Sequence, residues 1–313
     1  MFGIIPKPMW AKGATVDEAN RIPLAMTCTL VESGGKRILV ETGCGAASKY
    51  SDKEQGFFRF GNYTIVDSLA AIGVEPDAID LVILTHLHFD HAGGGTTADQ
   101  NSGRQVRGPF DPVAGDRAPR QPTTGVVGSD AEIASKGATG SSPASANVRG
   151  TEKRVTYRPT FPRAKYIVQR GEWDDALSGH VVMTGTYRPE NLAPLEAAGV
   201  LSFVNGESEI APGISVRPMP GHTRHQQGVV FSSGGQTALQ PADLIPTAAH
   251  IGLRHNMAYD LLPFENMQTK TAVLNEAVAK GYTMLFGQDP TAMAWRIESS
   301  GPGRFSAVRV ERT

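Results

Sequence analysis

The chain has 313 residues, 40% of them hydrophobic, which is enough to bury the core of one large domain or of two smaller ones. Its 30 basic and 31 acidic residues give a formal net charge of −1, so nothing in the bulk charge favours nucleic acid as a partner. No stretch approaches the roughly 20 apolar residues that span a bilayer, and neither a secretory signal nor a disulfide framework is evident, so a cytoplasmic location is expected.

In the first third of the chain, the pattern of apolar residues predicts strands that lead into a short, histidine-rich run. In chain order we expect a β-hairpin of strands 24–31 and 37–40, a helix over 64–73, and a strand at 81–84. The run Leu81-Val82-Ile83-Leu84 is continuously apolar, as in a strand buried on both faces. That strand would present Thr85 and His86 at its carboxyl end.

Residues 97–155 differ from the rest of the chain in being rich in Gly, Ser, Thr, Ala, Pro and Arg. Such a length without hydrophobic periodicity is unusual inside a compact domain. We therefore expect an irregular insertion within a single domain that spans residues 1–313.

Regular patterning resumes after the insertion. We expect a strand at 164–168, helices at 172–177 and 190–198, a meander of short strands at 200–204, 208–210, 214–218, 228–232 and 236–239, a helix at 266–280, a strand at 284–286, and an edge strand at 305–310. Strands and helices thus mix in two halves that each begin with strands, and this predicts an α/β fold of sheets packed face to face with helices outside.

The chemistry is concentrated in Thr85-His86-Leu87-His88-Phe89-Asp90-His91-Ala92-Gly93-Gly94. Its histidines and aspartate follow one strand so closely that a turn can aim all four side chains into one pocket. Imidazole and carboxylate ligands together suit zinc or another first-row divalent ion. The glycines Gly93-Gly94-Gly95 are interpreted as a turn that lets the backbone pass close to this site.

This run resembles the metal-binding motif of the metallo-β-lactamase superfamily and is especially similar to that of its lactonase-like hydrolases. Pro220-Gly221-His222-Thr223 resembles the next ligand turn of the family, Ala242-Asp243-Leu244 resembles its bridging aspartate segment, and Glu41-Thr42-Gly43 extends the likeness upstream. The resemblance implies a four-layer αβ/βα sandwich. It also implies that His86, His88 and His222 hold a first metal, that Asp90 and His91 hold a second, and that Asp243 bridges the two.

The chain departs from the family at Gln288, which stands where a last histidine ligand is expected. A glutamine carbonyl is a weaker and harder donor than imidazole, so the second metal would be bound less tightly. The resemblance therefore leaves one or two Zn²⁺ ions open, with Mn²⁺ or Fe²⁺ as alternatives, and Gln288 as a weak ligand.

The function implied is that of a metal-dependent hydrolase that uses metal-bound hydroxide, with Asp90 as the catalytic residue that orients the water and carries its proton. The substrate would be a small molecule, most simply a lactone or small ester, with promiscuity towards phosphotriesters or β-lactams. A homodimer fits the resemblance.

Two alternatives stay open. One is a thioesterase of the glyoxalase II type, which would need a basic patch for glutathione near the ligands. The other is a degenerate, non-catalytic metal-binding protein, which the replacement at Gln288 would fit.

Overall fold

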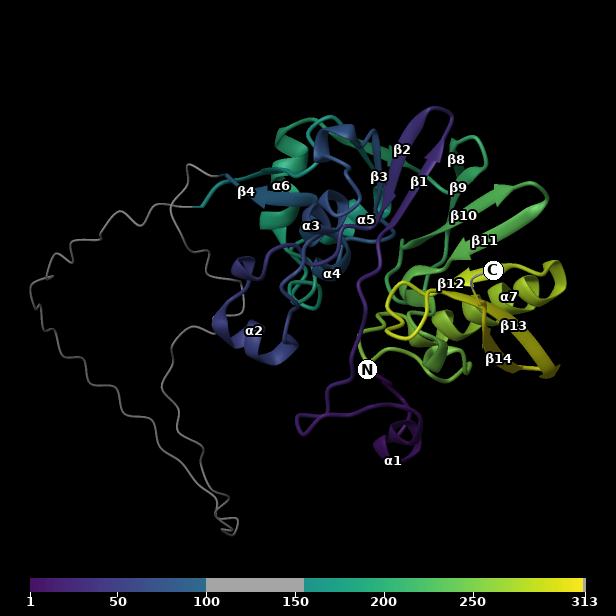
Figure 1. Ribbon diagram of the computed structural model, residues 1–313. Coiled ribbons are helices and arrows are strands. Elements are labelled where there is room, and N and C mark those ends of the chain that lie inside the picture. The colour runs from purple at the N-terminus through teal and green to yellow at the C-terminus, as the bar shows by residue number, and fades with distance from the viewer. Residues whose placement is uncertain (100–154, 312–313) are drawn as a thin grey trace, which may run out of the picture.

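The computed structural model describes residues 1–99 and 155–311, and in them two β-sheets pack against each other with helices on their outer faces (Figure 1). This is the predicted α/β sandwich of four layers. The predicted insertion at 97–155 falls largely outside the described residues. Its first residues, Thr97 and Ala98, are not irregular as predicted, because they pair with a strand that returns at Tyr157.

The first sheet has the strand order β1-β2-β3-β6-β7. Its strands are β1 (Thr29–Ser33), β2 (Lys36–Val40), β3 (Leu81–Ile83), β6 (Lys165–Gln169) and β7 (Leu201–Val204). The predicted hairpin is confirmed as β1 and β2, which turn at Gly34 and Gly35, both with positive φ. The other neighbours pair in parallel, so the carboxyl ends of β2, β3 and β6 meet at one edge.

The second sheet has the order β14-β13-β12-β11-β10-β9-β8. Its strands are β8 (Ser208–Ala211), β9 (Ile214–Pro218), β10 (Gln227–Ser233), β11 (Gln236–Gln240), β12 (Thr283–Leu285), β13 (Ala294–Gly301) and β14 (Arg304–Arg309). β8 to β11 form the predicted meander, and β14 is the predicted edge strand.

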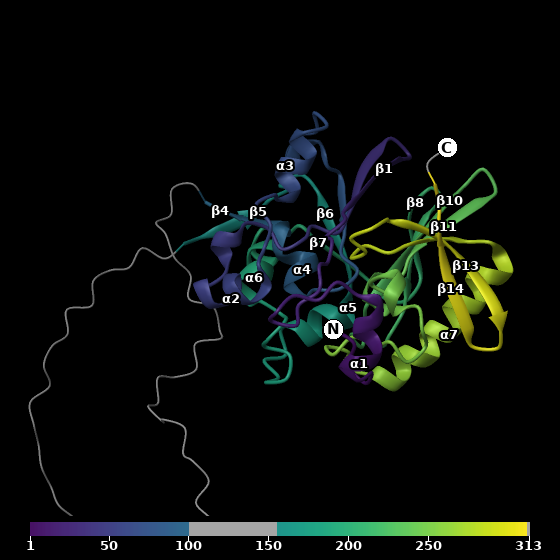
Figure 2. The same cartoon turned by 60° about the horizontal axis from the view of Figure 1, so that its bottom comes forward.

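Helices and a small ribbon complete the fold. The helices are α1 (Lys7–Trp10), α2 (Asp52–Phe58), α3 (Ile65–Ala70), α4 (Phe89–Ala92), α5 (Arg170–Ala176), α6 (Pro189–Ala197) and α7 (Pro263–Lys280), and the ribbon pairs β4 (Thr96–Ala98) with β5 (Tyr157–Pro159). In Figure 2, α7 lies beside the second sheet, far from α3 and α6. None of the described helices is long and apolar enough to cross a membrane.

In the two large sheets, β7 and β13 differ from the prediction. The run 200–204 was assigned to the meander, but β7 pairs in parallel with β6 in the first sheet. Hydrophobic alternation does not specify a partner strand, and the crossover through α6 delivers this strand to the first sheet. β13 was not predicted, because its sequence Ala-Trp-Arg-Ile-Glu-Ser-Ser-Gly is mostly polar on an exposed sheet face.

The core follows the alternation of side chains along the strands. Val40 and Ile83 of the first sheet pack on Val216 of the second, and these residues form the contact between the sheets. Leu39 and Val82 point the other way into a cluster with α5 and α6, while Leu239, Met284 and α7 form a third cluster. Three apolar layers therefore join four layers of secondary structure, and they leave the loops at the carboxyl ends of the strands free to build a site.

Candidate metal centre

The residues singled out from the sequence meet at the carboxyl ends of strands from both sheets. His86, His88, Asp90 and His91 follow β3, His222 follows β9, Asp243 follows β11, and Gln288 follows β12. All except Asp90 are at least nine-tenths buried, and the side chain of Asp90 keeps 23% of its surface exposed. Segments more than 200 residues apart in the sequence thus contribute to one cluster.

Three histidines form the first part of the cluster. His86, His88 and His222 each offer a ring nitrogen within 4.8 Å of the other two. His222 Nε2 and His88 Nδ1 are 3.0 Å apart, and Nε2 of His86 is buried without a hydrogen-bond partner among the described residues. Three converging imidazoles with an unpartnered nitrogen are a suitable donor set for a Zn²⁺ ion.

The second ring nitrogens of His86 and His222 have hydrogen-bond partners, whereas Nε2 of His88 has none among the described residues. Thr85 Oγ1 lies 3.1 Å from His86 Nδ1, and the buried carboxyl of Asp260 lies 2.9 Å from His222 Nδ1. Such partners fix the tautomer and ring orientation of a ligating histidine. Asp260 was missed from the sequence, because it lies 38 residues beyond His222 in a loop without any motif.

A second carboxyl, also missed, ties together the two loops that carry the histidines. Glu172 of α5 is fully buried and accepts hydrogen bonds from Leu87 N, Tyr187 Oη and Thr223 Oγ1 at 3.1, 2.8 and 2.7 Å. Leu87 lies between two of the histidines, and Thr223 follows the third. The sequence indicated only a helix at this point, and no spacing marked the glutamate.

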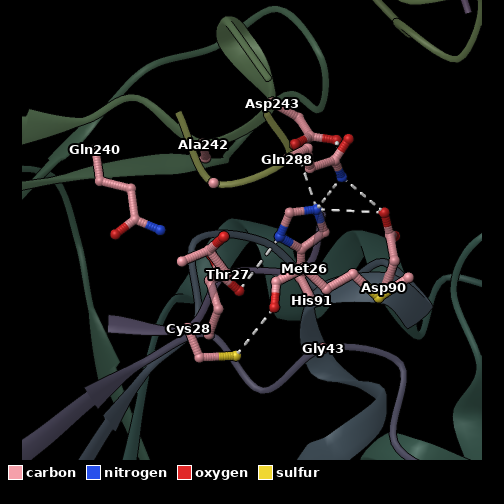
Figure 3. A pocket seen from close by; sticks show the side chains of 12 residues that line it. Met26, Thr27, Cys28, Gly43, Asp90, His91, Gln240, Ala242, Asp243 and Gln288 are labelled. Carbon is pink, nitrogen blue, oxygen red and sulfur yellow. Dashed lines mark hydrogen bonds and ion pairs between the residues drawn. The ribbon is translucent and has the colours of Figure 1, made fainter. Parts of the chain in front are cut away.

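The other part of the cluster is rich in carboxylates (Figure 3). His91 Nε2 lies 3.3 Å from Asp243 Oδ1 and 3.5 Å from Asp90 Oδ2, while His91 Nδ1 lies 3.3 Å from Glu41 Oε2. Gln288 Nε2 is 2.9 Å from Asp90 Oδ2, 3.2 Å from His91 Nε2 and 3.4 Å from Asp243 Oδ2. The structure thus brings together every residue that the resemblance named.

The glycine run makes the approach of Glu41 possible. A Cβ atom on Gly94 would lie 2.1 Å from Thr42 O, and one on Gly93 would lie 2.4 Å from Cys44 O, so no larger residue fits at either position. Thr42 N donates to His91 O at 2.9 Å across this contact. The interpretation of the glycines as a close backbone passage is therefore confirmed.

Burial and neighbouring charges set the protonation of the cluster. Burial, reinforced by the other imidazoles, lowers the pKa of His86 and of His88. Burial also acts to lower the pKa of His91, but Asp243, Asp90 and Glu41 outweigh it and raise that pKa above the usual value. Burial acts to raise the pKa of Asp90, and His91 overcomes it, so the pKa of this carboxyl is lowered. Neutral His86 and His88 and an ionised Asp90 are the forms that metal binding requires, whereas, against burial, the carboxyls of Asp260 and Asp243 raise the pKa of His222.

Comparison with known proteins agrees with this geometry. Residues 21–102 match the family model of the metallo-beta-lactamase superfamily. An N-acyl homoserine lactonase of Bacillus cereus is 32% identical over 90 residues, which are 26% of this chain and 36% of that protein, so only about a third of the curated relative is matched.

Solved structures extend the likeness over the whole chain. A probable metal-dependent hydrolase from Staphylococcus aureus has a TM-score of 0.73 at 22% identity, covering 100% of this chain and 92% of that one. A dizinc quorum-quenching lactonase in complex with a product has a TM-score of 0.62 at 17% identity, covering 93% and 81%. At these identities the structures show the fold alone, and the fold is that of the superfamily. Residues 21–102 thus resemble the metallo-β-lactamase superfamily, and the fold of the described residues is the one that this resemblance implied.

Proposed function

We propose that this protein is a metal-dependent hydrolase that cleaves lactones or small esters. The observation that carries the proposal is the convergence of three buried imidazoles, each offering a ring nitrogen within 4.8 Å of the others, beside the partly exposed carboxylate of Asp90. The match to a lactonase over 90 residues supports the substrate class.

His86, His88 and His222 would hold the ion, with Asp243 Oδ2 beside them at 3.5 Å from His222 Nε2. A bound divalent ion would polarise the scissile carbonyl and lower the pKa of a coordinated water. Imidazole and carboxylate donors favour Zn²⁺, with Mn²⁺ or Fe²⁺ as the alternatives.

Asp90 would transfer a proton during the reaction. In lactone hydrolysis water adds to the carbonyl carbon, the ring C–O bond breaks, and the leaving alkoxide needs a proton. An ionised carboxylate that faces the pocket can take the proton from the attacking water and return it to that oxygen. Neither cysteine is a good nucleophile, since burial raises the pKa of the Cys28 thiol to about 12 and also raises that of Cys44.

A thioesterase of the glyoxalase II type is less well supported. Such an enzyme would need basic side chains for glutathione, and among the described residues no lysine or arginine lines the pocket beside Asp90.

The test is elemental analysis of metal per chain, as purified and after zinc or manganese reconstitution, with hydrolysis of an N-acyl homoserine lactone, an aryl ester and a thioester assayed in parallel. Bound metal with lactone or ester turnover that is lost on chelation is the expected result. Preference for the thioester would contradict the substrate class. Tight metal binding without turnover on any substrate would favour a non-catalytic metal-binding protein.

A further inference from the structure

The Gln288 backbone is held in place beside the carboxylate part of the centre. Its backbone N–H donates to Pro246 O at 3.1 Å, and its backbone carbonyl accepts from Ala25 N at 2.9 Å. The residue is 4% exposed, so the amide has little freedom to leave the cluster.

The amide nitrogen of Gln288 faces two carboxylate acceptors. Asp90 Oδ2 at 2.9 Å and Asp243 Oδ2 at 3.4 Å are carboxylate oxygens, and His91 Nε2 lies at 3.2 Å (Figure 3). An amide NH₂ group has two hydrogens to donate, which suits this environment. The reverse orientation would place the Gln288 carbonyl oxygen against two carboxylate oxygens, which only accept hydrogen bonds.

Among the described residues, no amide donates to the converging ring nitrogens of His86, His88 and His222. Nε2 of His86 has no hydrogen-bond partner among the described residues, and the facing nitrogens of His88 and His222 are two like atoms 3.0 Å apart. An ion there would satisfy the converging nitrogens. Beside Asp90 the amide supplies hydrogens to the carboxylates, and Gln288 Oε1 is buried without a hydrogen-bond partner among the described residues.

We propose that the centre binds a single divalent ion, at His86, His88 and His222, and that the Gln288 amide takes the place of a second ion by donating hydrogen bonds to Asp90 and Asp243. This inference rests on the proposed function for the first ion. Gln288 is then a positioning residue: it does not ligate metal, and it fixes the carboxylate that handles the proton.

The experiment counts ions on the whole protein. Metal-free wild type is titrated with Co²⁺, followed by the visible absorption of the bound ion, and saturated protein is freed of excess ion and analysed for metal per chain. One ion is expected for wild type. For Gln288→His, which restores an imidazole beside His91, two are expected.

The matched control is Gln240→His. Gln240 lines the same pocket, but its amide oxygen lies 3.3 Å from Thr29 Oγ1 and apart from the Asp90 cluster (Figure 3), so one ion is expected in this variant. Two ions in wild type, or one ion in a folded Gln288→His protein, would overturn the inference and leave the proposed function intact. Wild type that binds no ion would refute the proposed function itself, and the wild-type count decides even if the variants do not fold.

The positioning role has its own measurement. Gln288→Met keeps the length of the side chain but removes both donors, so one ion should remain bound while kcat on a lactone falls roughly tenfold and KM is unchanged, as expected for the loss of a hydrogen bond to a charged group. A change in KM or in ion number, with kcat preserved, would show that Gln288 does not act through Asp90.

Discussion

The two parts of the metal centre use neighbouring residues of one motif in different ways. His86 and His88 face His222 and leave ring nitrogens that converge without partners, whereas Asp90 and His91, only a few residues further on, face an amide that supplies donors. Both pairs of residues therefore come from one sequence motif. Residues from distant loops, His222 on one side and Gln288 on the other, decide whether its side chains face another imidazole or an amide donor.

The largest effect expected is on the histidine part. His86→Ala should abolish tight metal binding and hydrolysis together, because two imidazoles remain from a set of three. Metal analysis, activity and a thermal unfolding curve are the measurements, with the exposed His180→Ala as control. Full metal content in His86→Ala would mean that the two parts do not differ as described.

The second-largest effect is expected at Asp260, whose carboxyl lies 2.9 Å from His222 Nδ1. Asp260→Asn should weaken metal binding by about 10-fold to 100-fold, since the loss of an orienting partner commonly costs that much. Competition with a chelator measures the affinity, and Asp77→Asn, at an exposed position, is the matched control. An unchanged affinity would show that the 2.9 Å contact with His222 Nδ1 does not support the ligand.

Glu172→Gln should lower the free energy of unfolding of the metal-free protein by about 1–2 kcal/mol, because a carboxylate that accepts three buried hydrogen bonds is replaced by a group with a single acceptor oxygen. Urea denaturation measures the difference, and Glu196→Gln on exposed α6 surface should have no effect. Since Glu172 joins the loops of the histidine part, metal binding should weaken as well, whereas a purely local loss of stability would leave it unchanged.

The smallest effect concerns Lys270, which donates to His250 O and His255 O at 3.1 and 3.0 Å and so anchors the loop that leads to Asp260. Burial lowers the pKa of Lys270 from 10.5 to about 8. Below pH 8 the Lys270 amine is charged in both the folded and the unfolded chain, so the free-energy cost of burying the charge is fully present. Between about pH 8 and 10.5 the folded chain loses this proton while the unfolded chain keeps it, and the cost decreases. Its contribution to stability therefore rises with pH in that window.

Lys270→Met should remove this dependence. The difference in unfolding free energy between wild type and variant should grow by on the order of 1 kcal/mol between pH 7 and pH 10, measured by urea denaturation of metal-free protein at each pH. A difference that is constant with pH would show that the Lys270 amine titrates alike in both states.

Much of the fold followed from local pattern. The hairpin of β1 and β2, the buried strand β3 and the helix α7 were expected because apolar periodicity and glycine turns act over a few residues. The placement of β7 was wrong, since pairing depends on the path of the chain through α6 and not on the strand itself. Whether the insertion at 97–155 is irregular remains a prediction for residues 100–154.

The sequence by itself determined which residue types meet in the centre, because the spacing of His86, His88, Asp90 and His91 after a buried strand constrains where their side chains can point. Only the tertiary structure decided what supports them. Asp260, Glu172 and the orientation of the Gln288 amide are set by contacts between loops that lie 38 to 198 residues apart, and no local pattern records such contacts.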